Sequence, residues 1–262
     1  MIGVLLTSTC YFRGISKKQL NERCEDLANC IVSLPKHIDQ PYELIIADNS
    51  TPDLIPTEKL LTMCPDNTTF IRHTKNPGKH SGEAILVRDG VNLSAGRGHE
   101  WLFKLTGRYH LFGDWSLSSS LKTLETSGAD LLISLTGSSM REMPWATNHP
   151  MYHEYLASDK ILISALTHVF LARPEKLVRS GLFKREYLYN CPENLNYEQV
   201  FYWAVKDMNI RHWSSPPVDG WIINRNTKQS VYERTKLASN PVFENVSDYN
   251  DIPCIDISPL IE

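Results

Sequence analysis

Short apolar runs and segments with helical spacing alternate through the first fifty residues. Residues 2–7 and 42–47 are continuous apolar runs, a pattern typical of strands that are buried on both faces of a sheet. Between them, residues 19–34 carry apolar side chains every three or four positions, which predicts a helix that ends at Pro35 or by Pro41. A strand, a helix and a second strand form a βαβ unit, so the sheet is expected to be parallel.

The same alternation continues to about residue 220. We expect further strands over residues 69–73, 100–105, 129–134 and 161–171, and helices over residues 84–93, 117–127, 174–180 and 195–207. The polar segments 76–83 and 137–155 are interpreted as loops. The expected fold class is therefore α/β, with a Rossmann-like, mostly parallel central sheet flanked by helices.

Length and composition narrow the classes of protein that fit this pattern. The chain has 262 residues, a formal net charge of −3 and no apolar run near the ~18–20 residues of a transmembrane segment. A slightly acidic balance argues against nucleic acid as a partner. We expect one domain over residues 1–224 and a polar C-terminal arm over residues 225–262.

The N-terminus and the cysteines predict a cytoplasmic protein. The first apolar run has no basic segment before it and turns polar at Thr7, so we interpret it as a strand and not as a signal peptide. The six cysteines form no CxxC pair and no cluster with zinc-site spacing. They are expected to be reduced thiols.

Polar residues that follow the strands are the first candidates for binding, because open α/β sheets bind ligands at the carboxyl ends of their strands. Asp48 and Asn49 follow the second strand, where a carboxylate suits a ribose or a uracil N–H, or where it forms an Asx turn. Lys79 lies in the segment 76–83, which matches neither a Walker A nor a GxGxxG motif. This segment is either an anion-binding helix start or a plain turn.

The segment from Lys104 to Arg108 is the most informative one. A buried strand ends here and delivers Thr106, Gly107 and Arg108 together. A glycine lets a ligand approach the backbone closely, and the forked cation of an arginine suits a diphosphate. The alternative is a strand end whose arginine forms a surface ion pair.

Later residues are candidates for acid–base chemistry and for acceptor binding. Glu193 and Glu198 lie before and within the start of the last helix, where a carboxylate either serves as a general base toward a sugar hydroxyl or only caps the helix. Arg141 and His153 occupy the irregular loop, and His212 follows the helix. They are candidate acceptor-binding residues, with an ordered surface loop and a structural histidine as the alternatives.

In the order of these motifs, residues 1–220 resemble a GT-A glycosyltransferase, broadly similar to the family-2-like nucleotide-sugar transferases. The resemblance implies that residues 1–224 are the catalytic domain and that the ends of its first two strands bind the nucleotide. These ends are Thr7, Ser8, Thr9 and Asp48. It also matches the Asn-x-Gly stretch before a helix to Asn76-Pro77-Gly78, and implies that Glu198 deprotonates the attacking hydroxyl, as in inverting members.

The chain departs from this family at the expected metal site. The next strand of a GT-A enzyme ends in a DxD motif that holds a divalent metal on the diphosphate, and here Thr106-Gly107-Arg108 stands in that place. Mg²⁺ and Mn²⁺ bind carboxylate oxygens, which this segment lacks. We therefore expect Arg108 and Lys104 to neutralise the leaving diphosphate without a required metal. Asp114 is the nearest carboxylate and keeps an Mn²⁺ or Mg²⁺ site open.

The leading hypothesis is a glycosyltransferase of polysaccharide biosynthesis. It would move a sugar from a nucleotide-diphosphate donor to a hydroxyl of a glycan or of a lipid-linked acceptor. Two alternatives stay open: a nucleotidyltransferase that makes sugar nucleotides, and a non-catalytic glycan- or nucleotide-binding module of the same fold. The single glycine after the first strand, Gly14, disfavours the first alternative, and the missing DxD supports the second. Donor sugar, base, acceptor, stereochemistry and oligomeric state stay open.

Overall fold

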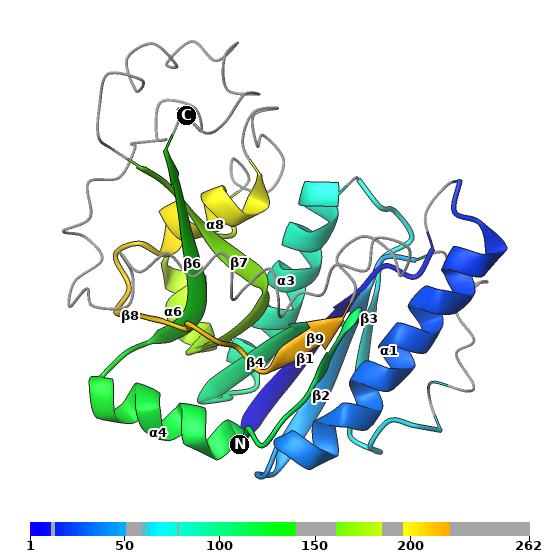
Figure 1. Ribbon diagram of the computed structural model, residues 1–262, viewed down its shortest axis with the longest axis horizontal. Helices are drawn as coiled ribbons and strands as arrows, with labels where there is room; N and C mark the ends of the chain where they lie inside the picture. Colours follow the sequence, from blue (N-terminus) through cyan, green and yellow to red (C-terminus); the bar gives the residue numbers. More distant parts are fainter. Residues whose placement is uncertain are drawn as a thin grey trace.

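A seven-stranded sheet in the order β3-β2-β1-β4-β7-β6-β8 forms the centre of the computed structural model (Figure 1). Its strands are β1 (Ile2–Ser8), β2 (Tyr42–Asp48), β3 (Thr69–Arg72), β4 (Trp101–Thr106), β6 (Leu131–Ser139), β7 (Ile161–Ala172) and β8 (Ile210–His212). Among these strands β7 alone runs antiparallel to its neighbours. A separate two-stranded ribbon pairs β5 (Tyr109–Leu111) with β9 (Val218–Gly220).

The structure describes residues 1–11, 14–50, 60, 62–77, 79–139, 161–184 and 196–220, and only the backbone of residues 79, 80, 138 and 139. The expected C-terminal arm, residues 225–262, lies outside these residues. Among the described helices, none combines the length and apolarity that crossing a membrane requires. The four cysteines in the described part are free thiols, as expected.

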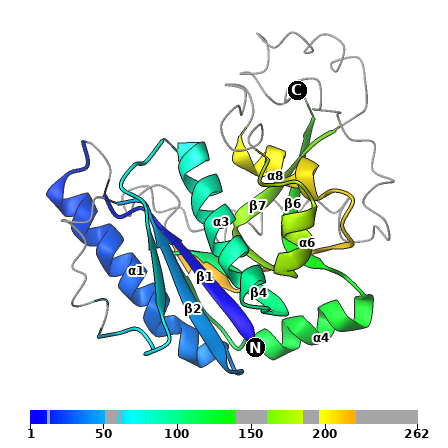
Figure 2. The ribbon, with the colours of Figure 1, turned by 180° about the vertical axis from the view of Figure 1, so that it is seen from behind.

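Helices cover both faces of the sheet, as two opposite views show (Figures 1 and 2). They are α1 (Lys17–His37), α3 (Lys79–Gly96), α4 (Leu117–Ser127), α6 (Pro174–Arg179) and α8 (Tyr197–Val205). Helices α1 and α4 pack on one face against Leu6 and Phe103, whereas α3, α6 and α8 pack on the other against Leu5 and Phe170. The expected fold class, a Rossmann-like and mostly parallel sheet flanked by helices, is confirmed.

Strand register brings the polar strand ends together at one edge of the sheet. Thr7 of β1 pairs with Thr106 of β4, and Ser8 at the end of β1 pairs with Asp48 at the end of β2. Because β1, β2 and β4 are parallel, these residues share the carboxyl edge. This is the edge at which the sequence predicted the chemistry.

Helix α1 extends beyond both expected ends. Ser16 caps its first turn: Ser16 Oγ accepts a hydrogen bond from Gln19 N at 3.2 Å, and Gln19 Oε1 accepts one from Ser16 N at 3.1 Å. The expectation that Pro35 ends the helix is wrong, since the helix continues to His37. A proline in the last turn removes one N–H donor but leaves the closing bond from Ile38 N to the Leu34 carbonyl, at 2.8 Å.

Helix α3 begins earlier than expected. We interpreted residues 76–83 as a loop, whereas the helix starts at Lys79. Gly82 fits within its first turns because a Cβ there would lie only 2.7 Å from Asn76 Oδ1, so glycine lets this polar side chain press against the helix. Glu83 is thereby fixed on a helix rather than in a loop.

The later elements show three further differences. Strand β6 extends to Ser139, so residues 137–139 of the expected loop belong to a strand, and the rest of that expectation, residues 140–155, lies outside the described part. Helix α8 begins at Tyr197, two residues later than expected, because Asn196 caps it by accepting a hydrogen bond from Gln199 N at 2.9 Å. The three-residue strands β8 and β9 were not expected, since runs that short show no periodicity.

Helix α3 lies close to β1 because Gly90 has no side chain. A Cβ at this position would lie 2.3 Å from Leu5 Cδ1 and 2.5 Å from Leu5 Cδ2, both in the buried core. We expect Gly90→Ala to destabilise the protein by up to ~2 kcal/mol in urea unfolding, because overpacking costs about 1–3 kcal/mol and the gain in helix propensity offsets about 1 kcal/mol of that cost.

The matched control is Gly96→Ala at the end of the same helix. A Cβ there meets no atom within 4 Å, so we expect unchanged or slightly raised stability. Equal unfolding free energies for the two variants would contradict the close helix–strand packing.

Candidate functional site

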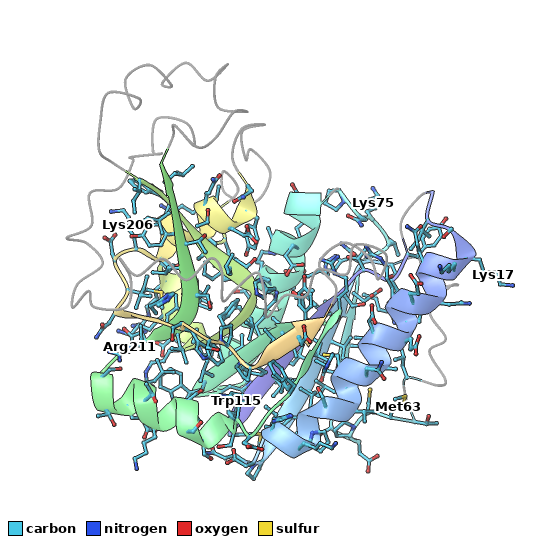
Figure 3. All side chains as sticks on the ribbon, viewed as in Figure 1. Lys17, Met63, Lys75, Trp115, Lys206 and Arg211 are labelled. Carbon is cyan, nitrogen blue, oxygen red and sulfur yellow. The ribbon has the colours of Figure 1, made fainter. Side chains whose placement is uncertain are left out.

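A buried ion pair between Lys104 of β4 and Glu83 of α3 lies at the carboxyl edge. Lys104 Nζ is 2.6 Å from Glu83 Oε1, and the lysine side chain is 0% exposed. Surface lysines such as Lys17 point away from the fold (Figure 3). Lysine is almost never fully buried unless it is paired, so this residue needs its partners inside the protein.

Lys104 uses all three of its ammonium hydrogens within the protein. Besides Glu83, its Nζ donates to Thr106 Oγ1 at 2.7 Å and to the Thr167 carbonyl of β7 at 2.6 Å. Thr7 Oγ1 of β1 then donates to Glu83 Oε1 at 3.1 Å. The network therefore joins four elements, and in this arrangement Lys104 has no hydrogen left to donate to a phosphate.

The surroundings hold this pair in its charged form. Burial alone would raise the pKa of Glu83, but the charge and hydrogen bond of Lys104, with Arg108 and Thr7, bring that pKa below its ordinary value. Burial lowers the pKa of Lys104, and the charges of Glu83 and Glu198 oppose that effect. Because Nζ donates three hydrogen bonds, the ammonium is the form that the geometry satisfies.

Asp48 is enclosed by the loops that follow β1 and β2. Its carboxylate accepts hydrogen bonds from Ser8 Oγ at 2.6 Å, from Ser50 N at 2.8 Å and from Ser50 Oγ at 3.0 Å. Burial raises the pKa of Asp48, against the effect of these donors. The bond to Ser50 N is an Asx turn, the structural alternative for this residue; its contact with a nucleoside stays a prediction.

The neighbouring residues Thr9 and Asn49 also bind each other. Thr9 Oγ1 donates to Asn49 Oδ1 at 2.6 Å, and Asn49 is buried. The Nδ2 of Asn49 lies near Gly82, where a Cβ would be only 2.9 Å away. These contacts order the end of β2 against the start of α3, and a role in donor binding stays a prediction for both residues.

Gly107 packs against a helix. A Cβ at Gly107 would lie 2.6 Å from Leu27 Cδ1 of α1, and its N–H donates to the Thr7 carbonyl at 2.8 Å. This contact gives a structural reason for the glycine, and its predicted role in donor binding stays a prediction.

Arg108 and Glu198 lie around the same ion pair. Arg108 is half-buried, with its guanidinium carbon 5.6 Å from the centre of the Tyr109 ring. Its charge acts on both Glu83 and Lys104. Glu198 is half-buried in the first turn of α8, and its charge acts on Lys104. Two residues proposed from separate motifs therefore lie within electrostatic range of the same ion pair.

His212 lies apart from this ion pair. It pairs with Ile133 of β6 on the edge strand β8, three strands from β4, which corresponds to about 14 Å across the sheet. Its Nδ1 accepts a hydrogen bond from Leu135 N at 3.1 Å, directly beyond the irregularity in β6. This is a structural role; its predicted contact with an acceptor has no support from its position.

Four predicted site residues cannot be placed by their side chains. Glu193, Arg141 and His153 lie outside the described residues. Lys79 is the first residue of α3, and its side chain is likewise outside the described part. Their roles in catalysis, in acceptor binding and in donor binding stay predictions.

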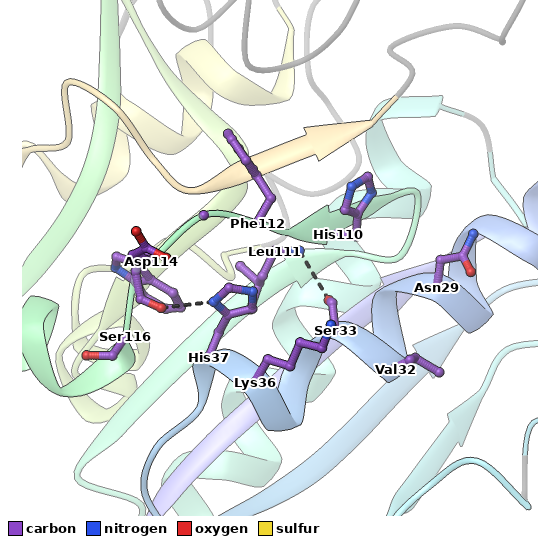
Figure 4. A pocket seen from close by; sticks show the side chains of 12 residues that line it. Asn29, Val32, Ser33, Lys36, His37, His110, Leu111, Phe112, Asp114 and Ser116 are labelled. Atoms are coloured by element: carbon purple, nitrogen blue, oxygen red, sulfur yellow. Dashed lines mark hydrogen bonds between the residues drawn. The ribbon is translucent and has the colours of Figure 1, made fainter.

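The residues at the end of β4 do not fit a divalent cation. Thr106, Gly107 and Arg108 contribute no carboxylate, and the nearby carboxylate oxygen of Glu83 is already paired with an ammonium group. Asp114 lies in the wall of a different cavity of about 630 Å³, between α1 and the segment after β5, together with Lys36 and His37 (Figure 4). In the described part of the chain no three His, Cys, Asp or Glu residues gather as a metal site would require.

Glu83 and Thr167 belong to the site but were not among the sequence-based candidates. Glu83 was assigned to the end of a loop, and Thr167 contributes only a backbone carbonyl. One signal was available: a lysine within the apolar run Trp-Leu-Phe-Lys-Leu requires an acidic partner.

No protein-family model and no curated protein matches the chain. Among solved structures, S. aureus TarS 1–349 in complex with UDP aligns over 80% of this chain and 56% of its own, with 13% identity and a TM-score of 0.44. Mouse xyloside xylosyltransferase 1 aligns over 80% of this chain and 84% of its own, with 11% identity and a TM-score of 0.48. The mannosyltransferase Ktr4p of S. cerevisiae aligns over 83% of this chain and 69% of its own, with 10% identity and a TM-score of 0.49.

The chain thus spans about half the length of the TarS fragment that it matches. Two of these three proteins are a xylosyltransferase and a mannosyltransferase by description. With TM-scores below 0.5, the likenesses carry no argument about what this chain binds or does.

The buried imidazole of His212 makes stability depend on pH. Burial, with Arg211 second, lowers its pKa to about 4, against about 6.5 in an unfolded chain. The unfolded state therefore binds more protons between these values, and stability falls as the pH drops from about 6.5 to about 4, by at most ~3 kcal/mol. Urea unfolding of the wild type at pH 7.5, 6 and 5 measures this loss.

The variant His212→Asn keeps an acceptor near the position of Nδ1 and removes the titrating group. We expect its stability to fall less than that of the wild type over the same pH range. Parallel pH dependences of the two proteins would show that another group is responsible.

Proposed function

We propose that this protein is a glycosyltransferase that uses a nucleotide-diphosphate sugar and transfers the sugar to a hydroxyl of a glycan or of a lipid-linked acceptor. One observation supports this function above the others. Glu83 pairs with Lys104 at the carboxyl edge of the sheet, and Arg108 and Glu198, from two other parts of the fold, act on this ion pair by their charge. A cation and two acids at this edge suit an anionic leaving group beside an attacking hydroxyl.

Arg108 is the group that we assign to the diphosphate. A guanidinium remains charged at all relevant pH values and offers paired donors that match phosphate oxygens. It lies at the end of β4, beside the ends of β1 and β2 to which we assign the nucleoside. Lys104 supports it indirectly by holding Glu83 and the strand ends in place, since its own hydrogens are used.

Glu198 is the group that we assign to the acceptor. Its carboxylate takes the proton of the acceptor hydroxyl as the oxygen attacks C1 of the sugar. The bond between the acceptor oxygen and C1 forms, the bond between C1 and the phosphate oxygen breaks, and the nucleoside diphosphate leaves with the bonding electrons. This displacement inverts C1, and Arg108 neutralises the charge that develops on the leaving group.

The first test is binding of nucleoside diphosphates. UDP and GDP, each with and without Mn²⁺, are the first probes. Ligand at about 100 times its Kd should stabilise the protein by ~2.7 kcal/mol, seen as a rise in Tm. Arg108→Gln should weaken diphosphate binding about 10- to 100-fold and leave binding of the free nucleoside unchanged.

Arg179→Gln is the matched control, because Arg179 is 70% exposed on α6 and pairs with Glu175. It should bind the diphosphates as the wild type does. If no UDP, GDP, CDP or dTDP compound raises the Tm of the wild type, the proposed function is wrong.

The second test separates catalysis from simple binding. Glu198→Gln should lower the rate of sugar transfer about 10²- to 10⁴-fold while the Kd for the donor stays within twofold, because the amide cannot accept the hydroxyl proton. Glu125→Gln, an exposed acid on α4, should leave both quantities unchanged. Equal transfer rates for the two variants would exclude Glu198 as the base, and pyrophosphate release from a nucleoside triphosphate and a sugar phosphate would indicate a nucleotidyltransferase.

A further inference from the structure

Glu83 holds its two carboxylate oxygens in different surroundings. Oε1 accepts hydrogen bonds from Lys104 Nζ at 2.6 Å, from Thr7 Oγ1 at 3.1 Å and from Thr106 Oγ1 at 3.4 Å. Among the described residues, no donor binds Oε2. One oxygen therefore fixes the carboxylate and the other is left to accept.

Glu83 is also the one half-buried side chain of a network whose other members are buried. Its side chain is 26% exposed, whereas that of Lys104 is 0% exposed, and Thr7 and Thr106 are buried. The network thus presents a single group at the carboxyl edge, and that group is an ionised carboxylate held by donors on two strands. A rigid acceptor of this kind loses little entropy when a ligand donor binds it.

The charge of this oxygen decides which part of a ligand it accepts. A carboxylate repels phosphate and attracts hydroxyl groups, and hydrogen bonds to a charged acceptor are about twice as strong as neutral ones. The cation that suits the phosphate, Arg108, lies within electrostatic range of Glu83. A ligand with a diphosphate and adjacent hydroxyls matches this pair of charges.

We propose that Glu83 recognises the transferred sugar of the donor, an inference that rests on the proposed function. Its Oε2 accepts hydrogen bonds from the ring hydroxyls of that sugar, while Oε1 stays bound to Lys104, Thr7 and Thr106. Glu83 is then a specificity-determining residue, distinct from Glu198, which acts on the acceptor. The nucleoside diphosphate lacks the hydroxyls of the transferred sugar and does not use this contact.

The variant Glu83→Gln tests this assignment. Its amide oxygen replaces Oε1 and remains an acceptor for Lys104, while its NH₂ group replaces Oε2 and cannot accept. Calorimetry would compare UDP with UDP-glucose and UDP-N-acetylglucosamine, and GDP with GDP-mannose. We expect the affinity for the sugar nucleotide that the wild type binds to fall about 10- to 100-fold, and the affinity for the matching diphosphate to change less than twofold.

The matched control is Glu100→Gln, which alters an exposed acid at the opposite end of β4, paired with Arg173 at 3.3 Å. It should change neither affinity.

If Glu83→Gln fails to fold, Glu83→Asp is the second variant. It keeps a negative charge near Lys104, and its shorter side chain withdraws the oxygen that replaces Oε2. The affinity for the sugar nucleotide should again fall while the affinity for the diphosphate is kept. The wild type should bind a deoxy sugar nucleotide, which lacks the recognised hydroxyl, more weakly than the complete sugar nucleotide. The Glu83 variant should bind these two ligands equally.

The possible outcomes separate the two proposals. If the wild type binds a sugar nucleotide but the Glu83 variant loses diphosphate and sugar nucleotide equally, Glu83 does not read the sugar and the proposed function stands. Unchanged affinities for both ligands in the variant would likewise overturn the role of Glu83 alone. If the wild type binds neither class of ligand, the proposed function fails, and the role of Glu83 fails with it.

Discussion

The ammonium group of Lys104 must find its acceptors inside the protein, because its side chain does not reach water. The three acceptors come from α3, β4 and β7, and Thr7 of β1 joins them through Glu83. Breaking a buried pair by removing one partner leaves an uncompensated charge, which costs about 3–5 kcal/mol. One charge therefore holds the ends of four elements together at the edge where binding is proposed.

Much of the fold could be predicted from the sequence. The strands β1, β2 and β4 are apolar runs that only a buried parallel sheet explains, and α4 has both the expected bounds. The failures occur where local signals conflict with packing. Pro35 is tolerated because it removes a single donor while the bond from Ile38 N to the Leu34 carbonyl still closes the helix, and Gly82 lies within α3 because polar side chains crowd the space that a Cβ would take. The register of β7 against β4 depends on contacts that no local pattern contains.

The candidate site was only partly predictable. Arg108 and Glu198 stand out because a charged residue at the end of a strand or the start of a helix is visible locally. Glu83 was missed because its partner lies 21 positions along the chain, on another element. The sequence also does not show that Leu27 of α1 fills the space beside Gly107. Local motifs thus locate an edge, and only tertiary contacts reveal which oxygen of Glu83 is bound within the protein.

The carbonyl of Thr167 extends the influence of Lys104 to the second half of the sheet. Strand β7 joins β4 to β6, and α8 packs on that side with Glu198 in its first turn. Sliding of β7 along β4 would pull the Thr167 carbonyl away from the ammonium group of Lys104. The ammonium group of Lys104 is therefore a constraint on how far the side of the sheet that carries Glu198 can move relative to Glu83.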